Sequence, residues 1–238
     1  MRARLFLTIV VGALSVVALV GAAATATAGR ACLAVRDGGY SYAGHQGATR
    51  GHGVRATLTL TREPNVHAGH VAGWVGVGGP GQGARDGDAW IQAGIAALPH
   101  LGKVLYVEIV REAAERELVL VDDSVTIGRA YRIAVVEVAG LPGWWQVRVD
   151  GAPVTERIRM PGSSGRWAPI VTAESWNGGT QTCNAFGFRF DGVSVSRGAG
   201  GSWRPFVSGH RFLDGTNTLR DLEGSTPRAA TFVAASSN

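Results

Sequence analysis

Apolar and polar residues alternate along many short stretches of this chain with a period of two. Runs of β-branched and apolar residues are separated by clusters of Gly, Pro, Asp and Asn, a pattern typical of half-buried strands. Asp150-Gly151 between two such runs is a strong signal for a hairpin turn. The pattern predicts strands at 55–62, 71–77, 90–95, 104–111, 117–121, 129–138, 144–149, 154–159, 168–176, 185–195 and 203–207. Strands at this spacing predict an all-β fold, a sandwich or jelly roll.

The phase of the alternation separates two faces on four of these strands. Residues two apart in a strand share a face, so Trp74 opposes Val75 and Gln92 opposes Ile91. An antiparallel sheet often has a solvated face that needs no function, but tryptophans are large apolar surfaces that are costly to leave in water. If the four strands share a sheet, we expect an aromatic-walled groove. The face so predicted carries His70, Trp74, Trp90, Gln92, Tyr106, Glu108, Thr172, Glu174 and Trp176.

The first residues have the pattern of a secretory signal peptide. Arg2 and Arg4 precede an apolar run over 5–20, and Ala26-Thr27-Ala28 supplies a cleavage site. An uncleaved membrane anchor is the alternative, but the apolar run is short for a bilayer and lacks a basic flank. A lipoprotein anchored through Cys32 is disfavoured by Arg30. We therefore expect residues 1–28 to be removed, and the protein to be secreted, extracellular and without stable membrane association.

The remaining 210 of the 238 residues suit one domain with a sizeable core. We expect an N-terminal arm over 29–50, a sandwich domain over 51–207 and a loosely held tail over 208–238. Without Arg2 and Arg4 the formal net charge falls from +5 to +3. No basic run is interleaved with aromatic residues, so a nucleic-acid partner is not indicated. We expect a monomer.

The two cysteines, Cys32 and Cys183, predict a disulfide in an oxidising compartment. Closing so long a loop is worth about 4 to 5 kcal/mol in a chain-entropy account. Two cysteines so far apart do not form a zinc site, and His67 and His70 lack the H-E-x-x-H pattern. The glycine-rich stretch 76–81 opens onto a loop rather than a helix, so it does not predict a nucleotide site. We expect no metal and no cofactor.

Several motifs resemble those of the glutamic peptidases, or eqolisins. In that family a WVGIDG strand is followed by an LQTG strand that carries a catalytic glutamine. Residues 74–79 (WVGVGG) and 90–94 (WIQAG) are similar to this pair. Tyr106-Val107-Glu108 stands where the family has its WYEW strand, and 168–176 (APIVTAESW) is similar to the AEFIIEDF strand with the catalytic glutamate. The resemblance covers 54–195, and would make this chain a divergent, bacterial-type secreted member.

The resemblance implies a concanavalin-like antiparallel β-sandwich of the jelly-roll type. It also implies a secreted endopeptidase that hydrolyses protein or peptide substrates through Gln92 and Glu174, with an activated water. Trp74, Trp90, Tyr106, Glu108 and Trp176 would contact the substrate. The chain departs from the family at Gly78, which replaces the aspartate of GIDG, and around Tyr106, where the WYEW tryptophans are missing.

Two other functions fit the same residues. A tryptophan-lined groove also suits a non-catalytic module that binds glycans or peptides, because the concanavalin-like fold alone does not specify activity. A glycan-active enzyme would use Glu108 and Glu174 as paired carboxylates, but that chemistry leaves Gln92 without a necessary role. Loss of turnover, rather than of binding alone, on substitution of Glu174 distinguishes an enzyme from a binding module.

Overall fold

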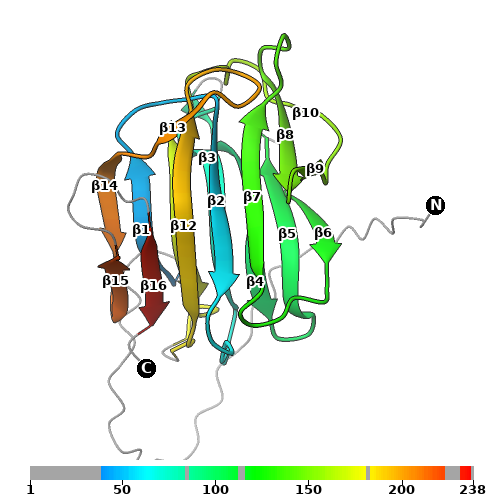
Figure 1. Ribbon diagram of the computed structural model, residues 1–238. Helices are drawn as coiled ribbons and strands as arrows, with labels where there is room; N and C mark the ends of the chain where they lie inside the picture. Colours follow the sequence, from blue (N-terminus) through cyan, green and yellow to red (C-terminus); the bar gives the residue numbers. More distant parts are fainter. Residues whose placement is uncertain (1–38, 84–85, 112–115, 181–182, 223–230, 237–238) are drawn as a thin grey trace, which may run out of the picture.

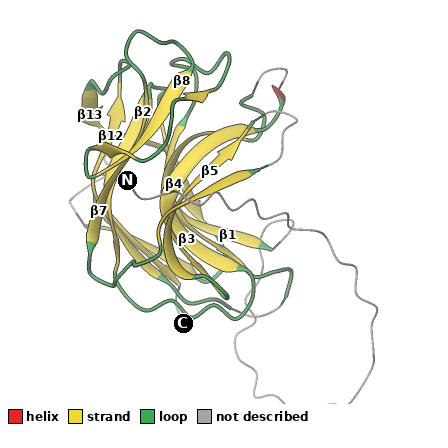
Figure 2. Cartoon of the chain, turned by 90° about the vertical axis from the view of Figure 1, so that its right-hand side faces the viewer, coloured by secondary structure: helices red, strands yellow, loops and turns green. Residues whose placement is uncertain are grey.

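Two antiparallel sheets stack face to face in the computed structural model, which describes residues 39–83, 86–111, 116–180, 183–222 and 231–236. Figure 1 looks onto the sheet that contains β2, β7 and β12, and Figure 2 shows the two layers from the side. Strand pairing in both sheets is antiparallel throughout the described residues. The architecture is a β-sandwich, as the alternation in the sequence predicted.

Each sheet combines strands that are far apart in the sequence. In spatial order, the seven-stranded sheet consists of β14 (Ser208–Leu213), β1 (Tyr40–Gly47), β11 (Pro169–Trp176), β3 (His70–Gly79), β4 (Ala89–Leu98), β5 (Gly102–Val110) and β6 (Glu117–Asp122). The nine-stranded sheet consists of β10 (Ile158–Arg159), β8 (Trp144–Val149), β7 (Ala130–Glu137), β2 (Gly53–Leu60), β12 (Gly187–Ser196), β16 (Phe232–Ser236) and β15 (Asn217–Asp221), with β13 (Trp203–Pro205) beside β12 and β9 (Ala152–Pro153) beside β8.

The core lies between the sheets and is built from the apolar face of each strand. Val75, Ile91 and Val107 contribute from the seven-stranded sheet, and Phe188 and Trp145 from the nine-stranded sheet. Burying a large apolar side chain of this kind stabilises the fold by about 1.5–3 kcal/mol. The core thus fixes which face of each strand looks outward.

The predicted phase of the alternation is confirmed. Trp74 and Tyr106 belong to a separate apolar cluster on the outer face of the seven-stranded sheet. Gln92, Glu108 and Glu174 lie on the same strands as core residues but project away from the core, as the period of two requires. The four strands do share one sheet, in the order β11-β3-β4-β5.

The described parts of the expected arm over 29–50 and tail over 208–238 are ordered as strands. β1 lies inside the seven-stranded sheet, where it pairs with β11 on one side and β14 on the other. β14, β15 and β16 extend both sheets, and Phe232 of β16 is fully buried. These strands are short, and their apolar residues are interleaved with Gly, Ala, Ser and charged residues, so the sequence gives only a weak strand signal there.

Two local predictions near the β8 hairpin have different outcomes. The Asp150-Gly151 turn is confirmed, because both residues have positive φ angles, 52° and 88°, and β8 pairs directly with β9. The single strand predicted over 154–159 is wrong: only Ile158–Arg159 is a strand. Before it, the hydroxyl oxygen of Thr155, rather than a backbone carbonyl, accepts the hydrogen bond from the amide of Val147, at 3.1 Å.

Three expectations concern residues outside the described part of the chain. These are the signal peptide over 1–28, the first ten residues of the arm, 29–38, and within them Cys32. No free cysteine occurs among the described residues, but the pairing of Cys183 with Cys32 stays a prediction. No helix in the described part of the chain combines the length and the apolar character that crossing a membrane requires.

Candidate active site

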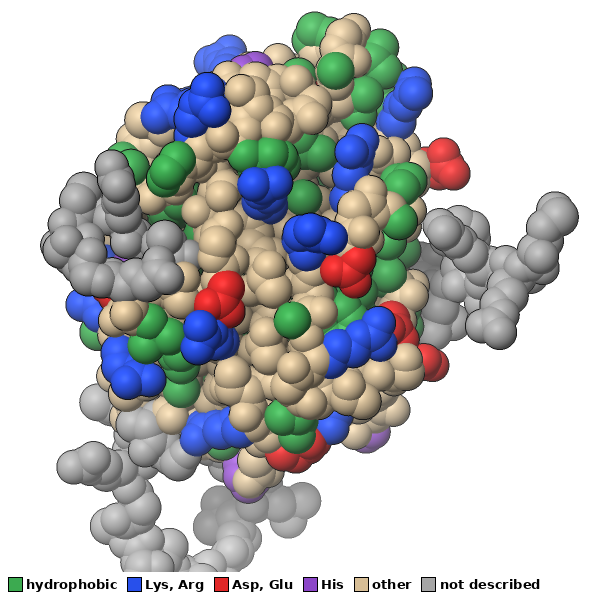
Figure 3. All heavy atoms as spheres, viewed as in Figure 1, with side chains coloured by type: hydrophobic (Ala, Val, Ile, Leu, Met, Phe, Trp, Pro, Cys, Tyr) green, Lys and Arg blue, Asp and Glu red, His purple; other side chains and the backbone are tan. Residues whose placement is uncertain are grey.

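A cleft of about 790 Å³ opens on the outer face of the seven-stranded sheet. Its described lining comes from β1, β3, β4, β5, β11 and β14, from the loop between β3 and β4, and from Arg116 just before β6. The lining residues are Tyr40, Tyr42, Gln46, Trp74, Gly76, Val77, Gly78, Gly79, Pro80, Gln82, Asp88, Trp90, Ile91, Gln92, Glu108, Arg116, Ile170, Thr172, Glu174 and Phe212. The opposite face of the molecule, the outside of the nine-stranded sheet, carries scattered arginines with acidic side chains among them (Figure 3).

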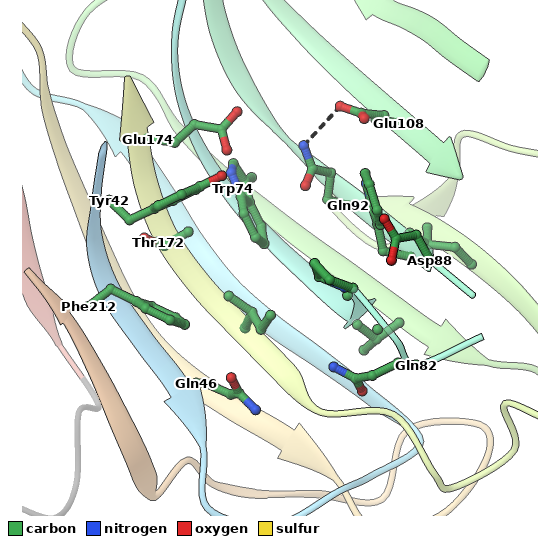
Figure 4. Close-up of a pocket in the computed structure, with 18 of the residues that line it drawn as sticks. Tyr42, Gln46, Trp74, Gln82, Asp88, Gln92, Glu108, Thr172, Glu174 and Phe212 are labelled. Atoms are coloured by element: carbon green, nitrogen blue, oxygen red, sulfur yellow. Dashed lines mark hydrogen bonds between the residues drawn. The ribbon is translucent and has the colours of Figure 1, made fainter. Parts of the chain in front are cut away.

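The register of the strands places Gln92 and Glu174 on either side of Trp74. Gln92 on β4 is opposite Gly76 on β3, whereas Glu174 on β11 is opposite Ala72 on β3. Trp74 lies between these two positions of β3 and on the same face. Figure 4 shows the indole of Trp74 between the two side chains. The floor of the cleft therefore carries an amide, an indole and a carboxylate together.

Two glycines leave room for these side chains. A Cβ at Gly76 would lie 3.0 Å from the Cβ of Gln92, and one at Gly94 would lie 2.7 Å from the Cα of Trp74. Side chains at either position would displace the neighbouring strand or the residue opposite, since real Cβ contacts are longer. Glycine at both positions thus lets Gln92 and Trp74 lie flat on the floor of the cleft.

The side chain of Gln92 is held by two neighbours on β5. Its Nε2 donates to Glu108 Oε2 at 3.0 Å and to the hydroxyl of Tyr106 at 3.2 Å. The first of these hydrogen bonds is the dashed line in Figure 4. Gln92 is only 7% exposed, so its amide has little freedom to turn. These contacts fix the direction of the N–H groups before any ligand binds.

Glu174 is buried in the cleft floor and contacts His70. Its Oε1 lies 3.2 Å from His70 Nε2, and its side chain is 8% exposed. The charge of Glu174 acts on its neighbours. Burial raises the pKa of Glu108, and the nearby negative charge of Glu174 raises it further against the opposing effect of Arg116. Burial and the charges of Glu174 and Glu108 together raise the pKa of Tyr106 well above its usual value.

The indole N–H of Trp74 is buried and donates to no group among the described residues. Trp74 itself is only 8% exposed. A buried donor without an acceptor costs about 1–3 kcal/mol, so native proteins rarely keep one without a reason. A ligand or a water molecule held between Gln92 and Glu174 would supply the acceptor.

Aromatic side chains form one wall of the cleft, next to Glu174. Tyr40 stacks on Tyr42, with ring centroids 6.1 Å apart, and on Trp176, at 6.0 Å. Phe212 on β14 continues this wall, 6.2 Å from Tyr42. Such rings provide flat apolar surfaces for substrate side chains.

The structure brings most of the predicted site residues into one cleft. Trp74, Trp90, Gln92, Glu108 and Glu174 all line it. Two predicted substrate-binding residues do not appear among the described lining: the side chain of Tyr106 is buried beneath Gln92, and that of Trp176 packs behind Tyr40.

Sequence reasoning missed the residues that come from outside the four central strands. Tyr40, Tyr42 and Phe212 lie on strands that were not predicted. Arg116 precedes β6 in a polar stretch with no motif around it. The period of two in Tyr40-x-Tyr42 was the available signal for the aromatic wall. In the described part of the chain, no group of three or more His, Cys, Asp or Glu residues is arranged to hold a metal ion.

Comparison with solved structures finds the same architecture in eqolisins. Scytalido-glutamic peptidase with a transition-state analogue inhibitor matches with a TM-score of 0.50 and 15% identity, over 84% of this chain and 98% of that one. The same peptidase with a peptide-based analogue gives 0.48 and 14%, with the same coverage. SCP-B, an eqolisin in a complex with the tripeptide Ala-Ile-His, gives 0.45 and 15%, again over 84% and 98%.

At such low identity the likeness shows the fold alone: this chain has a distantly eqolisin-like β-sandwich. No protein-family profile and no curated protein matches the sequence.

Proposed function

We propose that the cleft hydrolyses peptide bonds, with Glu174 and Gln92 as the catalytic pair. The observation that carries this proposal is the arrangement on the cleft floor. A buried carboxylate and an oriented amide flank the unpartnered N–H of Trp74. The eqolisin-like fold supports the same function, since eqolisins are peptidases.

The proposed reaction needs only the pair and a water molecule. The Glu174 carboxylate accepts a proton from the water as its oxygen attacks the scissile carbonyl carbon. The amide N–H of Gln92 donates to the oxygen that becomes negative, and one such donor is worth about 3 to 4 kcal/mol of barrier. As the carbon–nitrogen bond breaks, protonated Glu174 returns the proton to the leaving amine.

Glu108 and Tyr106 act in this scheme as positioning residues for Gln92. Both hydrogens of the Gln92 amide have acceptors on β5. Donation to the oxyanion therefore shares or replaces one of these contacts. The aromatic wall formed by Tyr40, Tyr42 and Phe212 would hold the substrate beside the pair.

Substitution of the pair tests the proposal. We expect Gln92→Ala and Glu174→Ala each to abolish cleavage of an unfolded protein while the circular dichroism spectrum and the melting temperature stay close to those of the parent. Asp88→Ala is a matched control, because Asp88 also lines the cleft but is exposed, and its carboxylate accepts a hydrogen bond from the amide of Gly81. Cleavage that survives both substitutions of the pair would refute the assignment.

A binding module remains the second candidate, because the aromatic wall also suits sugar rings. In that case Glu174→Ala weakens binding of a glycan or peptide and there is no turnover to lose. Retained binding by the parent without any cleavage, from a folded protein, would favour this candidate.

We also propose that the chain is exported and cleaved after Ala28. The signal-peptide pattern over 1–28 supports this proposal. Expression with the native N-terminus, followed by the intact mass of the exported product, tests it. A product that begins at Gly29 is expected, and a cell-bound product of full length would contradict it.

A further inference from the structure

Arg116 carries the positive charge in the cleft. Of the described lining residues, Asp88, Glu108 and Glu174 are acidic and Arg116 alone is basic. Its Nε lies 3.0 Å from Glu108 Oε1, while the side chain remains 55% exposed. The guanidinium also lies over the ring of Trp90, 5.7 Å from its centroid. The Nε side of the guanidinium is thus held by Glu108, while much of the side chain stays accessible to solvent.

The guanidinium has donors to spare. Burial lowers the pKa of Arg116, but the charge of Glu108 and a hydrogen bond with Tyr40 outweigh this effect and raise it, so the group is always charged. A guanidinium carries more N–H donors than these two contacts use, and their planar arrangement suits a carboxylate with two parallel hydrogen bonds. The exposed edge can therefore accept an anionic group from a ligand.

Arg116 is close to the catalytic pair. Glu108 links Arg116 to Gln92, since its Oε1 binds Arg116 and its Oε2 accepts a hydrogen bond from Gln92, each at 3.0 Å. One carboxyl group and two hydrogen bonds thus separate the guanidinium from the amide. A peptide residue spans about 3.3–3.6 Å, so a carboxylate held by Arg116 would be one or two residues from a carbonyl at Gln92.

The cleft also extends mainly to one side of the pair. Along β3 its lining runs from Trp74 to Gly79 and continues to Gln82. In the other direction the same face of β3 carries Ala72, which is buried in an apolar cluster with Ala96 and does not line the cleft. Among the described residues, Tyr40 on β1 continues the lining there, at the level of His70. A substrate therefore has room for several residues on one side of the scissile bond and few on the other.

We infer that Arg116 binds the free α-carboxylate of the substrate, so that the cleft releases one or two residues from the C-terminus of a peptide. The inference rests on the proposed function and specifies its substrate class as peptides with a free C-terminus, which departs from the endopeptidase that the resemblance implied. The acidic residues Asp88, Glu108 and Glu174 make the rest of the cleft unfavourable for an anion, so the guanidinium is the place where a terminal carboxylate is accepted. The bond broken and the path of the proton are those of the hydrolysis proposed above.

Matched peptides test this inference. One peptide is supplied with a free C-terminus, as the C-terminal amide, and as an amide whose last residue is glutamate. We expect kcat/KM at least tenfold higher for the free acid than for either amide, and products shortened by one or two residues by mass. Arg116→Ala should reduce this ratio to about one, and Arg116→Lys should keep part of it, because lysine retains the charge but not the paired donors.

Arg111→Ala is the control for general loss of charge. Arg111 lies in the same segment as Arg116, between β5 and β6. It forms an ion pair with Glu117 at 2.7 Å and is not among the described residues that line the cleft. We expect this variant to retain the preference for the free acid. Equal cleavage of acid and amide by the parent, or a preference that survives Arg116→Ala, would overturn the inference while leaving the peptidase proposal intact.

Binding measurements separate the inference from the proposed function. If the parent cleaves none of the peptides, tryptophan fluorescence reports their affinity for the cleft. Tighter binding of the free acid, lost in Arg116→Ala and kept in Arg111→Ala, would support the carboxylate site and contradict the peptidase. Equal affinities of acid and amide would overturn the carboxylate site.

Discussion

Gly78 stands where the eqolisin pattern has an aspartate, and its backbone explains the difference. Its φ angle is 91°, a conformation that L-residues rarely adopt. A Cβ at this position would collide with the carbonyl oxygen of Ala89 and approach the Cα of Trp90 to 2.9 Å. The aspartate is therefore not simply missing here; the path of β3 and β4 has no room for a side chain.

Gly78→Asp tests this account at the scale of one residue. Gly128→Asp is its control, because Gly128 has a φ of 80° with nothing within 4 Å of a Cβ. The control should lower the free energy of unfolding by about 1–2 kcal/mol through backbone strain alone. The collision at Gly78 should cost about 2 kcal/mol more. Urea denaturation measures the free energy of unfolding of both variants. Equal losses in Gly78→Asp and Gly128→Asp would show that the position of Gly78 has room for a side chain.

At the scale of elements, the sequence predicted the strands whose apolar residues alternate over a long run. The prediction covered four of these strands, β3, β4, β5 and β11, and the side chains on each face of them. It also placed Gln92, Glu108 and Glu174 on the outer face. β1 was missed because its buried residues include Ala43 and His45, which give no hydrophobic signal. Contacts between distant strands, such as Glu174 with His70, depend on strand order, which alternation does not encode.

A buried carboxylate joins three elements of the nine-stranded sheet. Glu137, at the end of β7, is fully buried. Its Oε1 accepts from the amide of Gly143 and its Oε2 binds His52 Nδ1, both at 2.6 Å. Burial raises the pKa of Glu137, but hydrogen bonds from Gly143, Ser164 and His52 outweigh burial and lower it below its usual value. Glu137 thus ties the residue before β2 and the turn before β8 to β7.

This lowered pKa predicts a loss of stability in acid. A carboxylate whose pKa is lower in the folded state stabilises the protein above the unfolded-state pKa and ceases to do so as the pH falls through the folded-state pKa. Glu137→Gln should therefore cost about 3 kcal/mol at neutral pH and flatten the decline of stability below pH 4.5. Glu156→Gln, at an exposed position, should leave the stability at neutral pH and its decline in acid unchanged. Melting curves over this range provide the measurement; an unchanged acid decline in Glu137→Gln would count against this role.

At the scale of the whole molecule, His45 helps to hold the two sheets together at one edge of the sandwich. Its Nδ1 lies 2.9 Å from the hydroxyl of Ser208 on β14, and its Nε2 lies 3.2 Å from Asp221 on β15, in the other sheet. Burial lowers the pKa of His45 against the opposing effect of Asp221, so the neutral ring is favoured. With the edge closed in this way, β1 and β14 can present Tyr42 and Phe212 to the cleft.

The seven-stranded sheet thus carries the cleft on its outer face, and we propose that this cleft cleaves peptide bonds through Glu174. The most direct measurement is digestion of an unfolded protein by the purified chain 29–238 across about pH 3 to pH 8, with Glu174→Gln alongside. We expect cleavage by the parent and none by the folded variant. Cleavage by both would contradict the role of Glu174, and cleavage by neither would contradict the peptidase and favour a binding module.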